Sequence, residues 1–311
     1  MAVERTIAVG PTIDELEGVA PAGPSDLQRA LRKLLRRPPA LFGLFCVAVV
    51  VMWAVVPGLF APLSPLEQSL DRYLKPPGYV DAQGQTYWLG TDQQGRDILS
   101  RVIWGSRVSL FVGIATVLVS GLIGVTLGLV AGYFGGKLDA VISRIVDTAL
   151  AIPFILLAMA LIAILGPSLQ NIIVAIALRT WIIYARVVRG EVLALKQREF
   201  ITGAKAMGCT TLRILAVYLL PNVFSSTIVV GTLYLGRMII IEASLSFLGV
   251  GVPPPTPTWG GMLSDGRAFL ETAWWIAFFP GVVLMLTVLG VNLLGDWLRD
   301  VLDPQMKRVA E

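Results

Sequence analysis

Residues 108–130 read VSLFVGIATVLVSGLIGVTLGLV and contain no charged side chain. As a helix rising about 1.5 Å per residue, this run is long enough to cross the roughly 30 Å hydrocarbon layer of a bilayer. The run is continuously apolar rather than alternating, which excludes a strand of a transmembrane β-barrel. The stretch therefore predicts an all-α integral membrane protein.

Five further apolar runs surround this one in the sequence. With it they predict six transmembrane helices, at about Ala40–Ala61, Val108–Val130, Val146–Leu165, Ile172–Val188, Val223–Phe247 and Trp274–Leu294. The chain is 55% hydrophobic and only 15% charged, whereas soluble domains are about 25% charged. Pro153, near the start of the third run, predicts a helix end and a kink.

The distribution of lysine and arginine predicts the orientation. Most of these residues fall in segments that share one side of the membrane with the N-terminus, such as residues 29–37 and 186–213. Cytoplasmic segments of bacterial membrane proteins carry this excess. We therefore expect a multi-pass protein of the bacterial cytoplasmic (inner) membrane, embedded in the lipid bilayer, with both termini cytoplasmic.

Several kinds of chemistry are excluded by what the chain lacks. It has no histidine, so a histidine general base, a His-containing triad and a histidine metal site are ruled out. Gly135-Gly136-Lys137 lacks the following Ser or Thr and the first glycine of a phosphate loop. We expect no catalysis, no cofactor or metal bound by this chain, and no nucleic-acid partner.

The longest polar interruption predicted on the cytoplasmic side is residues 189–221. Phe200, Ala204 and Met207 recur at the spacing of one helix face, Gly208 fits the end of that helix, and Thr210 fits the cap of a second one. Leu220 and Pro221 close the segment, and we expect Pro221 to interrupt the second helix. Such a unit suits docking into a groove of a soluble partner, or equally a position on the lipid surface.

A polar loop lies before the second apolar run and is predicted to be extracytoplasmic. Its Gly90 and Gly95 suit turns, while Thr91, Asp92, Arg96 and Asp97 can satisfy the backbone and one another. We expect a folded loop held by its own polar contacts. The alternative is a contact with a substrate-delivering protein.

Three charged residues fall within predicted spans and away from their ends. Arg179 lies near the middle of the fourth, and Arg237 and Glu242 lie in the outer half of the fifth. Arg237 and Glu242 are five positions apart, so they need not pair with each other. Charges in a membrane indicate function, here either the lining of a solute pathway or pairing with a partner subunit.

Several motifs, in order along the chain, resemble one family of proteins. The spacing from Gly208 to Leu220-Pro221 is similar to the cytoplasmic EAA loop of the membrane subunits of ATP-binding-cassette (ABC) importers, with Thr202 in place of the usual glutamate. Further strings resemble the C-type permeases of dipeptide, oligopeptide and nickel importers: LGTDQQGRD (89–97), YARVVR (184–189), EASLSFLG (242–249) and NLLGD (292–296).

The resemblance implies a type I ABC importer permease fold and a division of the chain into segments. These are a cytoplasmic tail with a basic amphipathic stretch (1–39), a first transmembrane helix (40–61), an extracytoplasmic segment (62–105), a five-helix domain (106–297) with a coupling loop (189–221), and a cytoplasmic tail (298–311).

The resemblance also implies the function and the partners. The chain would form half of the pathway for di- or oligopeptides, with nickel or another small solute as the alternative cargo. Its partners would be a second homologous permease, two ATPase subunits that hold ATP and Mg²⁺, and an extracytoplasmic solute-binding protein. An ion-coupled secondary carrier is the alternative from another class.

Overall fold

The computed structural model describes residues 34, 35 and 37–302, and this part of the chain is almost entirely helical. Residues 1–33, which hold most of the predicted cytoplasmic tail and its basic amphipathic stretch, lie outside the described residues, and so does the end of the C-terminal tail from residue 303. The helices are α2 (Pro38–Val55), α3 (Pro57–Phe60), α4 (Ile98–Phe134), α5 (Gly136–Ala151), α6 (Phe154–Leu165), α7 (Leu169–Leu195), α8 (Glu199–Ala206), α9 (Thr211–Arg213), α10 (Leu220–Phe247), α11 (Trp259–Gly266) and α12 (Trp275–Leu302). Short elements complete the chain: the 3₁₀ turns η2 (Leu70–Arg72) and η4 (Arg267–Phe269), the π-helical turn η3 (Ile214–Leu219), and strands β1 (Tyr79–Val80) and β2 (Thr86–Tyr87).

Five helices in the described part of the chain are long and apolar enough to cross a membrane, and a sixth crossing is formed if α5 and α6 count as one span. The third span, predicted over 146–165, is divided between α5 and α6. The chain bends by 91° between α5 and α6, at Pro153, which cannot donate a backbone hydrogen bond within a helix. The predicted helix end at Pro153 is confirmed, because α5 ends at Ala151 and a separate helix, α6, begins at Phe154.

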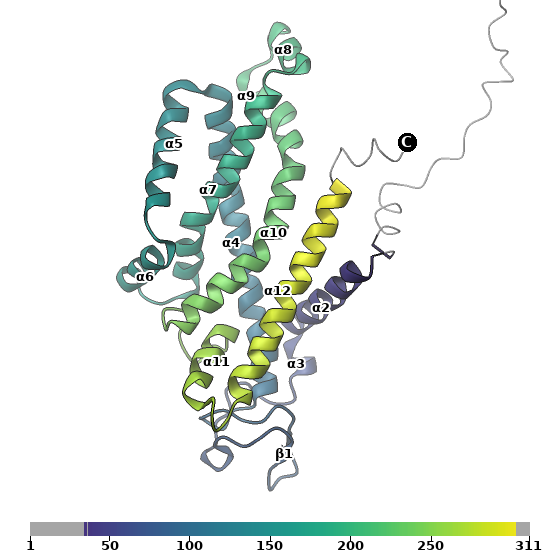
Figure 1. Ribbon diagram of the computed structural model, residues 1–311, viewed down its shortest axis with the longest axis vertical. Helices are drawn as coiled ribbons and strands as arrows, with labels where there is room; N and C mark the ends of the chain where they lie inside the picture. The colour runs from purple at the N-terminus through teal and green to yellow at the C-terminus, as the bar shows by residue number, and fades with distance from the viewer. Residues whose placement is uncertain (1–33, 36, 303–311) are drawn as a thin grey trace, which may run out of the picture.

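The bundle has two distinct ends (Figure 1). We call the end that carries α8 the α8 end; α2 begins and α12 finishes toward that end. At the opposite end lie the β1–β2 hairpin, the loop before α4, and α11, and we call it the hairpin end. α5 runs beside the bundle and α6 lies across it before α7 returns toward α8.

Helices α4 and α7 form the central pair, and glycine makes their close approach possible. Gly124, Gly128 and Gly132 follow one another at intervals of four on α4. A β-carbon at Gly124 would lie 2.4 Å from the Trp181 carbonyl oxygen, and one at Gly128 would lie 2.8 Å from that of Ala185. Small residues at this spacing let two helix backbones come into contact within a membrane.

At the hairpin end, α11 is anchored by a buried tryptophan. Trp259 is fully buried and its indole nitrogen donates a hydrogen bond to the Val102 carbonyl oxygen at 2.9 Å. Gly105 leaves room on α4 for this ring. The contact fixes α11 against the start of α4, which brings Asp265 of α11 toward the loop that precedes α4.

Candidate functional site

Two of the three charges predicted within spans line the same cavity. Arg179 of α7 and Arg237 of α10 both border a cavity of about 160 Å³ between these helices. Arg179 donates to the Ala149 carbonyl oxygen at 3.4 Å, and Arg237 lies over the Tyr234 ring at 5.6 Å. The lining contains no acidic residue, and within residues 37–302 neither arginine forms an ion pair. The cavity therefore offers two cationic groups to whatever enters it.

Glu242, the third charge, lies elsewhere. Its side chain is fully buried and accepts hydrogen bonds from the Ser109 hydroxyl at 3.0 Å and the Ser246 hydroxyl at 2.8 Å. It does not pair with Arg237, in agreement with their spacing. The structure thus brings Arg179 and Arg237 together and assigns Glu242 to the contact between α10 and α4.

The loop before α4 is folded on its own polar contacts, as expected. Thr91, Asp92, Arg96 and Asp97 are all buried. Asp92 accepts from the backbone nitrogens of Gln94 (2.8 Å) and Arg96 (3.0 Å) and from the Arg96 guanidinium at 2.6 Å. A carboxylate with this many donors holds the loop in one conformation.

Both glycines of the loop adopt conformations that favour glycine. Gly90 has φ of +80° and Gly95 has φ of +70°. A β-carbon at Gly95 would also lie 1.9 Å from the Ser69 carbonyl oxygen. The segment before the hairpin therefore packs directly on this turn.

Asp97 connects the loop to α4. Its carboxylate caps the helix by accepting from the Ser100 backbone nitrogen at 2.8 Å and the Ser100 hydroxyl at 2.6 Å. Burial raises the pKa of the Asp97 carboxyl. The cap explains why α4 begins at Ile98, well before the apolar run.

Asp92, Arg96, Arg101 and Asp265 form a charge cluster. Two of its members were not predicted from the sequence. Arg101, in the first turns of α4, is paired with Asp92, and Asp265 of α11 lies 3.7 Å from Arg96 and 3.6 Å from Arg101. An arginine at the start of an apolar helix was a local signal for the first. Nothing in the sequence near Asp265 indicates its contact with a loop some 170 positions earlier.

At the opposite end, α8 differs from its predicted form. Ile201 and Ala204 are its buried residues, and Ile201 packs into an apolar cluster with Val192, Ile214 and Leu219. Phe200 is 44% exposed and Met207 is 76% exposed. The prediction that Phe200, Ala204 and Met207 form one face is wrong for Ala204, which lies on the buried side.

The turn after α8 agrees with its predicted chemistry. Gly208 has φ of +75°, and the Thr210 hydroxyl accepts from the Arg213 backbone nitrogen at 3.4 Å to begin the next helix. The predicted interruption at Pro221 is wrong: helix Thr211–Phe247 is continuous. The π-helical turn η3 precedes Pro221 and accommodates the missing hydrogen bond.

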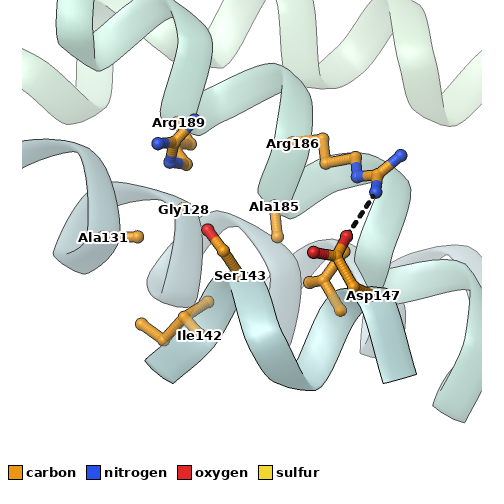
Figure 2. Close-up of a pocket in the computed structure, with 9 residues that line it drawn as sticks. Gly128, Ala131, Ile142, Ser143, Asp147, Ala185, Arg186 and Arg189 are labelled. Atoms are coloured by element: carbon orange, nitrogen blue, oxygen red, sulfur yellow. Dashed lines mark hydrogen bonds and ion pairs between the residues drawn. The ribbon is translucent and has the colours of Figure 1, made fainter. Parts of the chain in front are cut away.

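A second cavity, of about 260 Å³, lies among α4, α5 and α7 (Figure 2). Arg186 and Asp147 form an ion pair in its lining, with 3.2 Å between their charged atoms. Near the same cavity Arg189 donates two hydrogen bonds to the carboxylate of Asp139, at 2.5 and 2.7 Å. These two ion pairs connect α5 to α7. Arg186 and Arg189 thus have acidic partners within residues 37–302, and Arg179 and Arg237 have none there.

Comparisons with known proteins agree with this architecture. Residues 124–308 match a family described as "Binding-protein-dependent transport system inner membrane component", and residues 25–77 match "N-terminal TM domain of oligopeptide transport permease C". The di/tripeptide transport system permease protein DppC of Pseudomonas aeruginosa is 41% identical over 287 residues, which cover 92% of this chain and 95% of that one.

The comparisons found further relatives. The dipeptide transport system permease protein DppC of Alkalihalophilus pseudofirmus is 43% identical over 96% of this chain and 94% of its own. A chain from a structure of the MetNI methionine ABC transporter in inward-facing conformations is 25% identical, with a TM-score of 0.47, over 62% of this chain and 94% of that one. The family matches and the 41–43% identities to DppC proteins confirm the predicted resemblance to importer permeases. The chain belongs to the family of binding-protein-dependent transport system inner membrane components.

Proposed function

We propose that the chain is one permease subunit of an ATP-driven importer and forms half of the pathway for di- and oligopeptides. The observation that carries this proposal is the identity of 41–43% with di- and tripeptide permeases over more than nine-tenths of the chain. Agreement over that length includes the hairpin end, α8 and the helices between them.

In this proposal the α8 end faces the cytoplasm and the hairpin end faces outward. Arg198, Lys205 and Arg213 lie around α8, as the excess of cationic residues on cytoplasmic segments predicts. The chain binds no cofactor of its own. ATP and Mg²⁺ are held by separate ATPase subunits.

The surface proposed to meet those ATPases is carried by Phe200, Met207 and Leu212. All three are exposed apolar side chains at the α8 end, whereas Ile201 and Ala204 fix α8 to the bundle. A short helix held on its inner face and exposed on the other suits insertion into a groove of a partner. Movement of the partner would then pass through α8 to η3 and α10.

The cavity with Arg179 and Arg237 supports an anionic or zwitterionic cargo. Two cationic groups without an acidic neighbour repel a divalent metal ion and attract a carboxylate. A peptide carries a terminal carboxylate, so this pair favours peptides over nickel among the alternative cargoes. Uptake would proceed by alternating access with a second permease, as a solute-binding protein delivers the peptide outside.

Reconstitution tests the proposal. The chain, purified with the second permease and the ATPase subunits and placed in proteoliposomes with the solute-binding protein, should take up labelled Ala-Ala only when ATP is supplied. Replacing Arg179 and Arg237 with glutamine should lower uptake about tenfold per assembled complex. Uptake by the isolated chain under an ion gradient, or uptake of Ni²⁺ but not of peptide, would contradict the proposal.

A further inference from the structure

A polar cavity of about 480 Å³ opens at the hairpin end. It lies between the loop before α4, the segment 249–258 and α11, and is separate from the cavity of Arg179 and Arg237. Cavities of roughly this size accommodate small ligands. Arg96, Arg101 and Asp265 are among its lining residues.

The two arginines are buried but only partly satisfied. Each is 5% exposed, and both share the carboxylate of Asp92, which also accepts from two backbone nitrogens. The Nε atom of Arg101 is buried and has no hydrogen-bond partner in the described part of the chain. Desolvated guanidinium groups of this kind favour a further anionic partner.

In this structure the further anionic partner is Asp265, and its contacts with the two arginines are long. The Asp265 carboxylate lies 3.7 Å from one arginine and 3.6 Å from the other, beyond the usual hydrogen-bond distance. Its side chain is 37% exposed. Asp265 is thus the member of the cluster that an incoming group can replace without disturbing the Asp92 contacts.

We propose that this cavity binds a peptide in its zwitterionic form on the way to the membrane. The peptide carboxylate takes the place of Asp265 beside Arg96 and Arg101, and the freed Asp265 carboxylate pairs with the peptide ammonium group. This inference rests on the proposed function and deepens it, because it names the charge form of the cargo and its first contact with the permease.

Charge balance selects this ligand. Arg96, Arg101, Asp92 and Asp265 sum to zero, and a zwitterion keeps every charge paired. A lone carboxylate would leave Asp265 without a cation, and a metal cation would meet two arginines. The two termini of a dipeptide are about 6–7 Å apart at about 3.5 Å per residue, a separation that a cavity of this size can hold.

Protection of a cysteine from alkylation tests the inference without depending on transport. Thr256 is exposed and lines the cavity, whereas Thr272 is exposed at the same end and does not. In the purified complex carrying Cys209→Ser, Ala-Ala at millimolar concentration should slow maleimide labelling of Thr256→Cys at least fivefold and leave Thr272→Cys unchanged. Ala-Ala amide, N-acetyl-Ala-Ala and Ni²⁺ should protect less than twofold.

Asp265→Asn should raise the Ala-Ala concentration needed for half protection about tenfold. Asp265→Glu, which keeps the charge, should bring that concentration most of the way back to its original value. Glu271→Gln, a matched change of an exposed acid outside the cavity, should have no effect. Equal protection by all the analogues, or none by Ala-Ala in a complex that imports it, would overturn the inference and leave the proposed function standing. If the solute-binding protein without peptide protects Thr256→Cys by itself, the carboxylate that enters the cavity belongs to that protein. This result would also overturn the inference.

Discussion

Two groups of side chains, one at each end of the molecule, are placed in opposite ways. At the hairpin end, Asp92, Arg96 and Arg101 are buried and paired with one another. At the α8 end, Phe200 and Met207 are exposed although both are apolar. The buried charges therefore hold the loop of the hairpin end within one chain, whereas Phe200 and Met207 are surface that one chain does not cover. A change in the buried charges of the first should alter folding, and a change in the exposed apolar side chains of the second should alter only the work done with partners.

The largest effect is expected from Asp92→Ala. This substitution removes the shared partner of two buried arginines, and an uncompensated buried charge costs about 3–5 kcal/mol. Thermal unfolding of the purified protein in detergent should show a large drop in stability or no folded protein. Asp71→Asn is the control, because Asp71 is exposed at the same end and should change stability by less than about 0.5 kcal/mol. Equal stability of the two variants would contradict a self-contained hairpin end.

Gly95→Ala should cause the next largest loss of stability. A β-carbon there meets the Ser69 carbonyl oxygen at 1.9 Å, and φ is already +70°. Gly84→Ala is matched in backbone, with φ of +79°, but has open space around it. We expect a loss of about 1 kcal/mol for Gly84→Ala from the backbone alone and about 2 kcal/mol more for Gly95→Ala from the clash. Similar melting temperatures for the two variants would mean that the segment around Ser69 is not packed on the turn.

The contrast between the ends also explains what the sequence could predict. Loop 89–97 was predicted to satisfy its own polar groups because its acidic and basic residues lie within a few positions of one another. Asp265 could not be predicted, since its contact depends on Trp259 fixing α11 against α4. This contact depends on how α11 packs on α4, and the residues around Asp265 give no local sequence signal of it.

The membrane spans show the same limit. Apolar runs predicted where the helices lie, and Pro153 indicated the break, but the 91° bend depends on how α5 and α6 pack. Pro221 was expected to interrupt its helix, and a π-helical turn absorbs it instead. The interval of four between Gly124, Gly128 and Gly132 is, by contrast, a local signal of the α4–α7 contact.

At the α8 end, Phe200→Ser combined with Met207→Ser should separate stability from function. Both side chains are exposed, so unfolding free energy should change by about 0.5 kcal/mol or less. Peptide-stimulated ATP hydrolysis by the assembled complex should fall about tenfold, which corresponds to about 1.4 kcal/mol. Ile201→Ala is the opposite control: Ile201 is a buried residue of α8 that packs on the bundle, and its truncation should cost about 2–5 kcal/mol. Normal coupling in the double variant would remove the docking role of this surface.

The smallest effect is expected from an ion pair that has the chemistry of the Asp92 cluster without its burial. Arg37, before α2, pairs with Asp300 near the end of α12, and their side chains are 47% and 40% exposed. Water and salt screen such a pair, so Asp300→Asn should cost less than about 0.5 kcal/mol, and raising the salt from 0.1 to 1 M should abolish the difference from the wild type. Thermal unfolding at the two salt concentrations measures both. A cost close to that of Asp92→Ala, or one that persists in 1 M salt, would show that the Arg37–Asp300 pair is shielded from water and salt. Burial within the chain would then not explain why the two pairs differ in their contribution to stability.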